Sequence, residues 1–125
     1  MNKKSLILST IDGDLTRVCD IINSDVDLNA TDEEGWTALM WAIVNENIDV
    51  VRVLIKAGAN LNVVDSRGWT ALMFAVNHDY LDIITVLMDA GADTTVMNHK
   101  GKTVIDMAED KNSALIWATL LRGMK

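Results

Sequence analysis

The chain has 125 residues, half of them hydrophobic, with no proline, one cysteine and a formal charge of −7. This length favours a single domain, residues 1–125, and the apolar content is too high for a disordered segment. The lone Cys19 excludes an internal disulfide, and with it the small scaffolds that disulfides hold together.

The negative charge is concentrated in the first part of the chain. Residues 1–50 carry ten acidic and three basic side chains, whereas the charges of residues 51–125 cancel. Nucleic-acid binding needs clustered Lys and Arg that neutralise phosphates. We therefore expect no nucleic-acid partner, and a protein partner with a basic patch instead.

The first segment starts with Lys3 and Lys4 and continues with an apolar run that resembles the beginning of a signal peptide. The run covers only residues 5–11 before Asp12 and Asp14 end it, and no small-residue cleavage site follows. No other stretch approaches the ~18 apolar residues of a membrane span. We therefore expect a cytoplasmic protein that does not bind membranes.

Two motifs then recur at intervals of 33 residues. They are Gly-Trp-Thr-Ala-Leu-Met at 35–40 and 68–73, with a weak copy at 101–106, and Ala-Gly-Ala-Asn/Asp at 57–60 and 90–93. Aligning residues 32–64 with 65–97 gives 15 identities in 33 positions. Chance would give about two or three. A fixed period of this length is typical of stacked repeat proteins.

Each unit is predicted to form a turn followed by two helices. In the second unit, residues 32–35 have turn composition, and Thr37 can cap a short helix that runs to about Asn45. A second helix is predicted over 48–56, where apolar residues recur at helical spacing. Gly58 then occupies the place of a left-handed C-terminal cap, and the third unit repeats it.

The pattern Asp-x-x-Gly-x-Thr-x-Leu, followed by Ala and by Gly-Ala-Asn/Asp at a 33-residue period, resembles the ankyrin repeat. The resemblance implies an all-α solenoid of about four stacked helix-turn-helix repeats joined by finger loops. The repeats would cover residues 1–31, 32–64, 65–97 and 98–125, with the first and last as atypical caps.

The chain departs from the family pattern at three positions. Ala38 and Ala71 replace the family's Pro, Met40 and Met73 replace its His, and Glu46 and Asp79 replace its Gly between the helices. Methionine supplies apolar packing in place of a buried polar contact, so we expect a softer core. If the glycine position is left-handed, each replacement there costs ~1 kcal/mol and makes the turn a weak point.

The sequence contains no recognisable catalytic or metal-binding arrangement. His78 and His99 lack the spacing of metal ligands, and Cys19 has no His or Asp partner at a recognisable distance. Residues 25–31 begin like a calcium loop, but the required glycine and glutamate are absent. We therefore predict that the protein is not an enzyme and binds no metal or cofactor.

The four tryptophans are predicted to have different roles. Trp117 aligns with core positions of the two preceding repeats, so we predict that it is buried. Trp36 and Trp69 follow the turn glycine, on what the family resemblance implies is the inner, concave face, and Trp41 and Phe74 lie on the first helices. These rings either pack between neighbouring fingers or serve as binding anchors, and the sequence leaves both open.

The predicted finger tips form a charge gradient. The first tip is acidic, the second carries Ser66 and Arg67, and the third carries His99 and Lys100 with Lys102. The gradient is either a solvated surface or the footprint of a partner with basic groups near the second repeat and acidic groups near the fourth. The candidate partner-binding residues are Glu33, Glu34, Trp36, Trp41, Arg67, Trp69, Phe74, His78, Lys100 and Lys102.

These features favour a non-catalytic protein-protein interaction module that binds a protein partner through its concave face and finger loops and is a monomer when free. A narrower version is an inhibitor or immunity-type protein that neutralises one basic partner. Two alternatives stay open. One is an accessory protein of an enzyme, supplying a metal or substrate contact through His78, His99 or Cys19. The other is a structural protein that forms homo-oligomers.

Overall fold

A computed structural model describes residues 3–124, and all regular secondary structure within them is helical. The helices are α1 (Lys3–Ile11), α2 (Leu15–Ile22), α3 (Ala38–Val44), α4 (Ile48–Lys56), α5 (Ala71–Asn77), α6 (Leu81–Asp89), α7 (Val104–Asp110) and α8 (Ala114–Gly123). From α3 onward, equivalent helices begin 33 residues apart. The sequence period is therefore a structural period.

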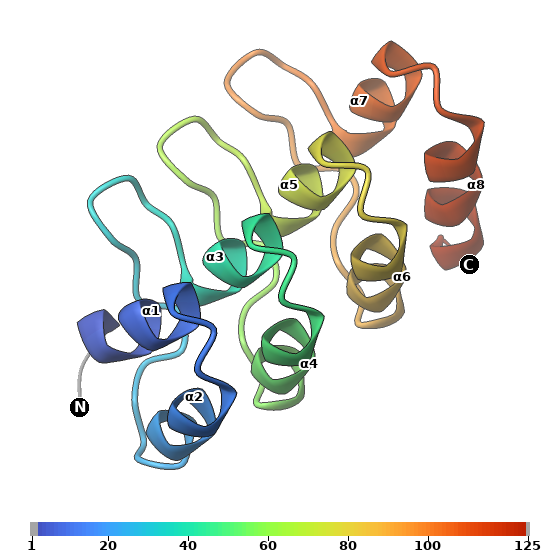
Figure 1. Ribbon diagram of the computed structural model, residues 1–125. Helices are drawn as coiled ribbons and strands as arrows, with labels where there is room; N and C mark the ends of the chain where they lie inside the picture. The colour runs from blue at the N-terminus through green and yellow to red at the C-terminus, as the bar shows by residue number, and fades with distance from the viewer. Residues whose placement is uncertain (1–2, 125) are drawn as a thin grey trace.

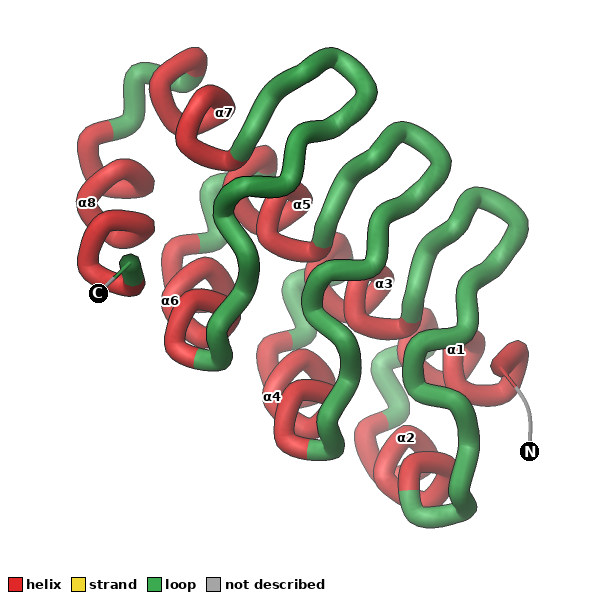
Figure 2. Tube along the Cα trace, turned by 180° about the vertical axis from the view of Figure 1, so that it is seen from behind, coloured by secondary structure: helices red, strands yellow, loops and turns green. Residues whose placement is uncertain are grey.

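The helices form two rows along one stack (Figure 1). Helices α1, α3, α5 and α7 contact one another in one row, and α2, α4, α6 and α8 do so in the other. Long loops connect each pair to the next and project from the same side of the stack, as Figure 2 shows from behind. This arrangement confirms the predicted all-α solenoid of stacked helix pairs.

Threonine caps begin the first helix of three successive pairs. The Thr37 hydroxyl accepts a hydrogen bond from the Met40 N–H at 3.2 Å, and Thr70 and Thr103 repeat this contact one and two periods later. Each bond satisfies a backbone donor that the first helical turn leaves without a partner. The predicted starts and ends of α3 and α4 are confirmed to within one residue.

The turns between paired helices are left-handed, which is the condition under which the sequence predicts weak points there. Glu46 has a φ of 55° and Asp79 a φ of 63°, in a region that favours glycine. The equivalent residues of the first and last pairs are Gly13 and Asn112, with φ values of 71° and 53°. Of these four turns, only the first has glycine, the residue that this backbone conformation favours most.

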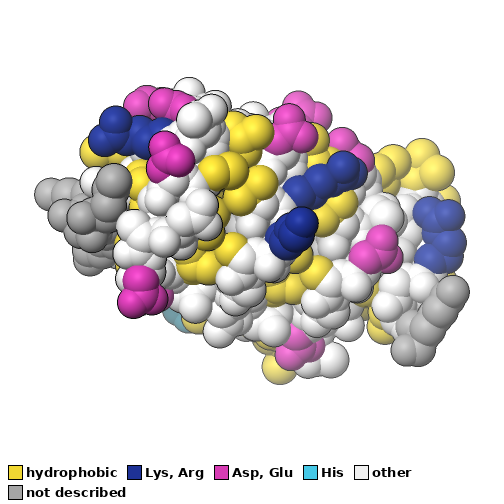
Figure 3. Space-filling model, turned by 90° about the horizontal axis from the view of Figure 1, so that it is seen from below, with side chains coloured by type: hydrophobic (Ala, Val, Ile, Leu, Met, Phe, Trp, Pro, Cys, Tyr) yellow, Lys and Arg dark blue, Asp and Glu magenta, His cyan; other side chains and the backbone are white. Residues whose placement is uncertain are grey.

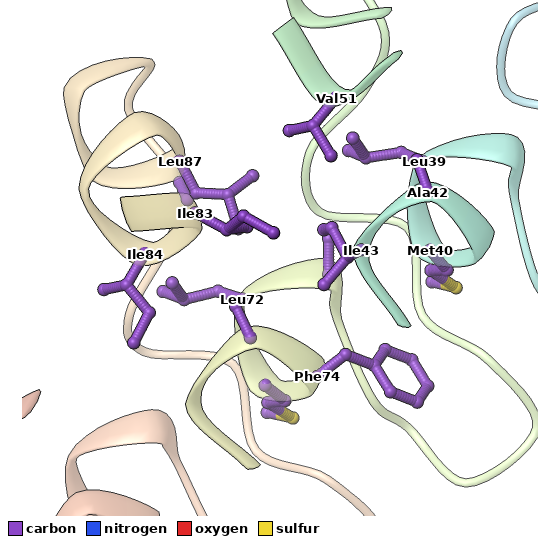
Figure 4. Packing of buried hydrophobic residues seen from close by; sticks show 14 of the residues in the cluster. Leu39, Met40, Ala42, Ile43, Val51, Leu72, Phe74, Ile83, Ile84 and Leu87 are labelled. Atoms are coloured by element: carbon purple, nitrogen blue, oxygen red, sulfur yellow. The ribbon is translucent and has the colours of Figure 1, made fainter. Parts of the chain in front are cut away.

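The core lies between the two rows and continues from one helix pair to the next (Figure 4). Leu54 and Leu87 are fully buried at equivalent positions, and Met40 and Met73 are each 1% exposed. On α4 and α6, Val50 and Ile83 are buried in addition to residues of the predicted apolar stripe, so each of these helices is buried on more than one side. Each internal helix thus packs both within its pair and against a neighbouring pair.

Trp117 departs from the prediction of a buried side chain. It lies on α8 at the position where α4 and α6 have fully buried Val51 and Ile84, yet it is 38% exposed. Helices α4 and α6 are each followed by a further helix that packs against them, whereas no further pair within residues 3–124 covers α8. The prediction was wrong because repeat alignment identifies a core position only where a neighbour completes the core.

Candidate functional site

The same local turn builds all three fingers, defined here as finger 1 (residues 32–36), finger 2 (65–69) and finger 3 (98–102). In finger 1, Oδ1 of Asp32 accepts hydrogen bonds from the Glu34 and Trp36 N–H groups, both at 3.0 Å. Asp65 and Asn98 make the equivalent pairs of bonds in the other fingers. A side-chain oxygen thus fixes the backbone that presents each finger tip.

Neighbouring fingers are joined by one backbone hydrogen bond each. The Ser66 N–H donates to the Glu34 carbonyl, and the His99 N–H donates to the Arg67 carbonyl, both at 3.0 Å. The close approach also requires glycine: a Cβ on Gly35 would lie 3.1 Å from the Asp65 Cα, and the φ of Gly35 is +80°. The fingers therefore form a connected row rather than separate loops.

Four aromatic rings form a continuous cluster beneath fingers 1 and 2. The ring of Trp36 lies 4.6 Å from that of Trp41 and 4.8 Å from that of Phe74, and Trp69 lies 5.2 Å from Phe74. Phe74 is 3% exposed, whereas the three tryptophans are half-buried. Figure 4 shows Phe74 on the opposite side of α5 from Ile84, away from α6.

This cluster bears on whether the aromatic residues pack between the fingers or serve as binding anchors. Phe74 joins the rings of neighbouring fingers and leaves little surface of its own, so it packs between them. The tryptophans stay partly accessible, and Trp36 and Trp41 line a surface hollow described below. Packing and binding are thus compatible roles for this group, with Phe74 as support and the tryptophans as the exposed surface.

The outer carboxylate oxygen of the finger aspartate has a different donor in each of the first two fingers. Asp32 Oδ2 accepts from Trp41 Nε1 at 2.9 Å. Phe74, at the position of Trp41 in the next repeat, has no such donor, and there Asp65 Oδ2 pairs with the Arg67 guanidinium at 3.4 Å. Between the second and third repeats, the helix residue changes from Trp41 to Phe74 and the tip residue changes from Glu34 to Arg67.

A hollow of about 520 Å³ lies between fingers 1 and 2 and is called here the inter-finger hollow. Its lining residues are Glu34, Trp36, Trp41, Ser66 and Arg67. The guanidinium of Arg67 lies 4.6 Å from the ring centroid of Trp69 and 5.7 Å from that of Phe74, within the range of cation–π attraction. The hollow combines indole faces with one carboxylate and one guanidinium at its rim.

The charges of the fingers differ in how far they are neutralised. Glu33 and Glu34 are exposed and make no ion pair among the described residues. Lys102 instead bonds to Asp110 at 3.0 Å. This hydrogen bond, together with the negative charge of Asp110, raises the pKa of Lys102. Lys100 is exposed. The predicted gradient is therefore strong at its acidic end and weakened at its basic end.

His78 lies apart from the other candidate residues. It caps the C-terminal end of α5, one helix length away from finger 2, which precedes the other end. Its ring stacks on that of Tyr80, with centroids 5.2 Å apart and an interplanar angle of 16°. The structure brings together the candidates from fingers 1 and 2, and places His78 and the finger 3 lysines outside that group.

The fold and the finger geometry agree with a comparison against known families. A family model for ankyrin repeats, in three copies, matches residues 6–98. The chain belongs to the ankyrin repeat family. Among curated proteins, the palmitoyltransferase akr1 of Schizosaccharomyces pombe is 44% identical over 52 residues. That match covers 41% of this chain and 8% of the length of the palmitoyltransferase, so it concerns one short segment of a much longer protein.

Two residues of this ankyrin site were missed by the sequence analysis. Asp32 was assigned only to a turn, although its carboxylate orients both Trp36 and Trp41. Leu8, which is 57% exposed, stands one 33-residue period before Trp41 and extends the apolar row toward the first repeat. Repeat register alone could have found Leu8. The indole bond of Asp32 had no signal in the sequence.

The side of the ankyrin stack on which α2, α4 and α6 lie has a different surface. Figure 3 shows acidic and basic side chains there, interspersed with small separate hydrophobic groups. The free thiol, Cys19, is half-buried on α2. The fingers are therefore the more distinctive surface, because they gather tryptophans and unpaired carboxylates in one place.

Two further findings concern the described part of the chain. No group of three or more His, Cys, Asp or Glu side chains in residues 3–124 is placed to hold a metal ion. No helix in the same residues is long and apolar enough to cross a membrane.

Proposed function

We propose that this ankyrin-repeat chain is a non-catalytic binding module that holds a protein partner against its fingers and first helices. Ankyrin repeats are generally protein-interaction modules. The observation that carries the proposal for this chain is the inter-finger hollow, in which half-buried Trp36 and Trp41 present ring faces beside exposed polar groups. Partly desolvated tryptophans in such pockets are the usual anchors of protein interfaces.

The partner in this proposal carries a basic patch. Exposed Glu33 and Glu34 stand unpaired among the described residues at the tip of finger 1, and the surrounding residues 1–50 hold the chain's excess of negative charge. Such a field speeds encounter with a basic surface. In the narrower version, the chain neutralises one partner as an inhibitor or immunity-type protein.

The remaining assignments belong to the same proposal. The chain acts as one domain over residues 1–125, is a monomer when free, works in the cytoplasm and binds neither nucleic acid nor membranes. Among its binding residues, Trp36 and Trp41 are the anchors, and Glu33 and Glu34 are the steering charges. Arg67, Trp69 and Phe74 support the rings, and His78, Lys100 and Lys102 contact the partner's periphery.

The test is affinity capture of partners from the native cell with the Trp36→Ala variant. We expect the captured partner to bind at least about tenfold more weakly than it binds the native chain, because hot-spot tryptophans contribute that much or more. Trp117→Ala is the matched control, since it removes an exposed tryptophan from the far end of the stack. Circular dichroism verifies that both variants are folded. Equal binding by both variants would disprove the proposal.

Self-association is a second candidate, and one observation favours it. Helix α8 exposes Leu115, Trp117 and Leu121, with exposed fractions of 67%, 38% and 48%. Exposed apolar groups of this kind are typical of contact surfaces. Light scattering at low and high concentration tests it: a mass that rises with concentration, and that Leu115→Gln/Leu121→Gln abolishes, would support homo-oligomerisation. A constant monomer mass would exclude it.

A further inference from the structure

The internal repeat supplies a template for what the inter-finger hollow binds. Positions 34, 36 and 41 of the second repeat correspond to 67, 69 and 74 of the third. In the third repeat the aromatic pair is covered by a cation, because the Arg67 guanidinium lies 4.6 Å from the ring centroid of Trp69. In the second repeat, a glutamate replaces that arginine and no cation of the described residues covers the pair.

The electrostatics of the hollow favour a positively charged guest. Glu34 lines it and makes no ion pair with any described residue. Arg67 lines the same hollow, but its charge is offset by the buried carboxylate of Asp65 at 3.4 Å. Asp32 adds a second carboxylate behind the rings, in contact with Trp41. Negative charge therefore prevails around the exposed indole faces.

We propose that the inter-finger hollow binds an arginine side chain presented by the protein partner. The guanidinium lies over Trp36 and Trp41 as that of Arg67 lies over its own aromatic pair, and donates hydrogen bonds to the Glu34 carboxylate and the Ser66 hydroxyl at the rim. This inference rests on the proposed function, since it names the chemical group that the binding surface recognises.

Arginine fits this arrangement better than lysine for physical reasons. Its guanidinium is planar, stacks on aromatic faces and is weakly hydrated, whereas an ammonium is a compact, strongly hydrated charge. Its fork of donors can bond a carboxylate in two places at once. The volume of about 520 Å³ accommodates the group together with its aliphatic stem.

The test uses four short peptides of one sequence that differ only in a central arginine, citrulline, lysine or glutamate. Binding is followed by the NMR signals of the indole N–H groups of the full chain. We expect the arginine peptide to shift the Trp36 and Trp41 signals saturably and to leave that of Trp117 unchanged. Citrulline has the same shape without the charge, so its peptide should bind about two- to fivefold more weakly.

Three variants test the role of Glu34. Glu34→Gln should weaken binding of the arginine peptide, while Glu46→Gln, the same change at an exposed glutamate between α3 and α4 that does not line the hollow, should leave it close to native. Glu34→Arg reproduces the residue of finger 2 and should abolish binding, because its own guanidinium covers the rings. Glu34 and Glu46 are both exposed at the surface, so we expect all three variants to retain the fold.

Several outcomes would overturn the inference. They are equal binding of the arginine and citrulline peptides, preferential binding of the lysine or glutamate peptide, equal effects of Glu34→Gln and Glu46→Gln, and the absence of any saturable shift. Failure of the proposed function is read separately, from capture of the native partner by the Trp36→Ala and Trp117→Ala chains. If Trp36→Ala abolishes capture of the partner but Glu34→Arg does not affect it, the proposed binding surface is supported and the proposed arginine site is disproved.

Discussion

The second and third repeats have the same finger turn but complete it with different donors. In the second, the carboxylate of Asp32 is bonded by the indole N–H of Trp41, which leaves the tip free to carry Glu34. In the third, Phe74 provides no donor, and Arg67 at the tip takes its place beside Asp65. The comparison indicates that the surface charge of a finger depends on the ring beneath it.

The largest effect is expected from removing the finger aspartate of the third repeat. Asp65→Ala leaves the N–H groups of Arg67 and Trp69 without their acceptor at a site that is 4% exposed. We expect a loss of about 3 kcal/mol in the free energy of unfolding, since bonds to a charged acceptor are worth about 1.5–3 kcal/mol each. Urea unfolding at neutral pH measures it.

Substituting asparagine for the finger aspartate should have different costs in the two repeats. Asn98 already serves finger 3, so Asp65→Asn should keep both backbone bonds and cost less than about 1 kcal/mol. Asp32→Asn should cost more, about 1–3 kcal/mol, because its amide NH₂ would face the indole N–H of Trp41 and leave that donor without an acceptor. Equal costs for the two asparagine variants would contradict the distinction between the repeats.

A smaller effect is expected when the donor to the finger aspartate in the second repeat is exchanged for that of the third. Trp41→Phe removes the indole donor from Asp32 and should reduce stability by about 1–2 kcal/mol. Adding Glu34→Arg gives the second repeat the chemistry of the third, and should restore about 0.5–1 kcal/mol in that background. A double-mutant cycle by urea unfolding measures this coupling. Additive effects would show that tip and ring are independent.

The left-handed turns give a prediction of similar size in the stabilising direction. Glu46→Gly should raise the free energy of unfolding by about 0.5–1 kcal/mol, because the cost of a positive φ exceeds the added entropy of an unfolded glycine. Asp79→Gly should gain less, since it also removes the contact of Asp79 with Lys111 at 3.3 Å. Thermal unfolding compares the two, and a larger gain for Asp79→Gly would refute this account.

The smallest effect concerns the loops that precede the fingers, where Asn60 of the second repeat corresponds to Asp93 of the third. The hydroxyl and N–H of Thr95 bond to Asp93 and lower its pKa below the ordinary value of 3.8. Because the pKa of Asp93 is lower in the folded chain than in the unfolded chain, its carboxylate stabilises the fold at pH values above the ordinary pKa. This stabilisation is lost as the pH falls through the pKa of the folded state. NMR titration should find Thr95→Val shifting the Asp93 pKa upward. Asp93→Asn should remove this pH dependence.

Much of the architecture was predictable because its causes are local. The 33-residue period, the threonine caps and the bounds of α3 and α4 all follow from spacing and from conformational preference. Each depends on residues a few positions apart. The sequence by itself therefore determined the repeat unit and its helices.

The candidate site was decided by tertiary structure. The sequence grouped the tryptophans but left packing and binding equally open, because the contact between Phe74 and both fingers spans two repeats. The indole bond of Trp41 to Asp32 and the pairing of Arg67 with Asp65 depend on where side chains meet in space. Burial of Trp117 was mispredicted for the same reason: whether a repeat position is core depends on what packs against it, which the residue alone does not encode.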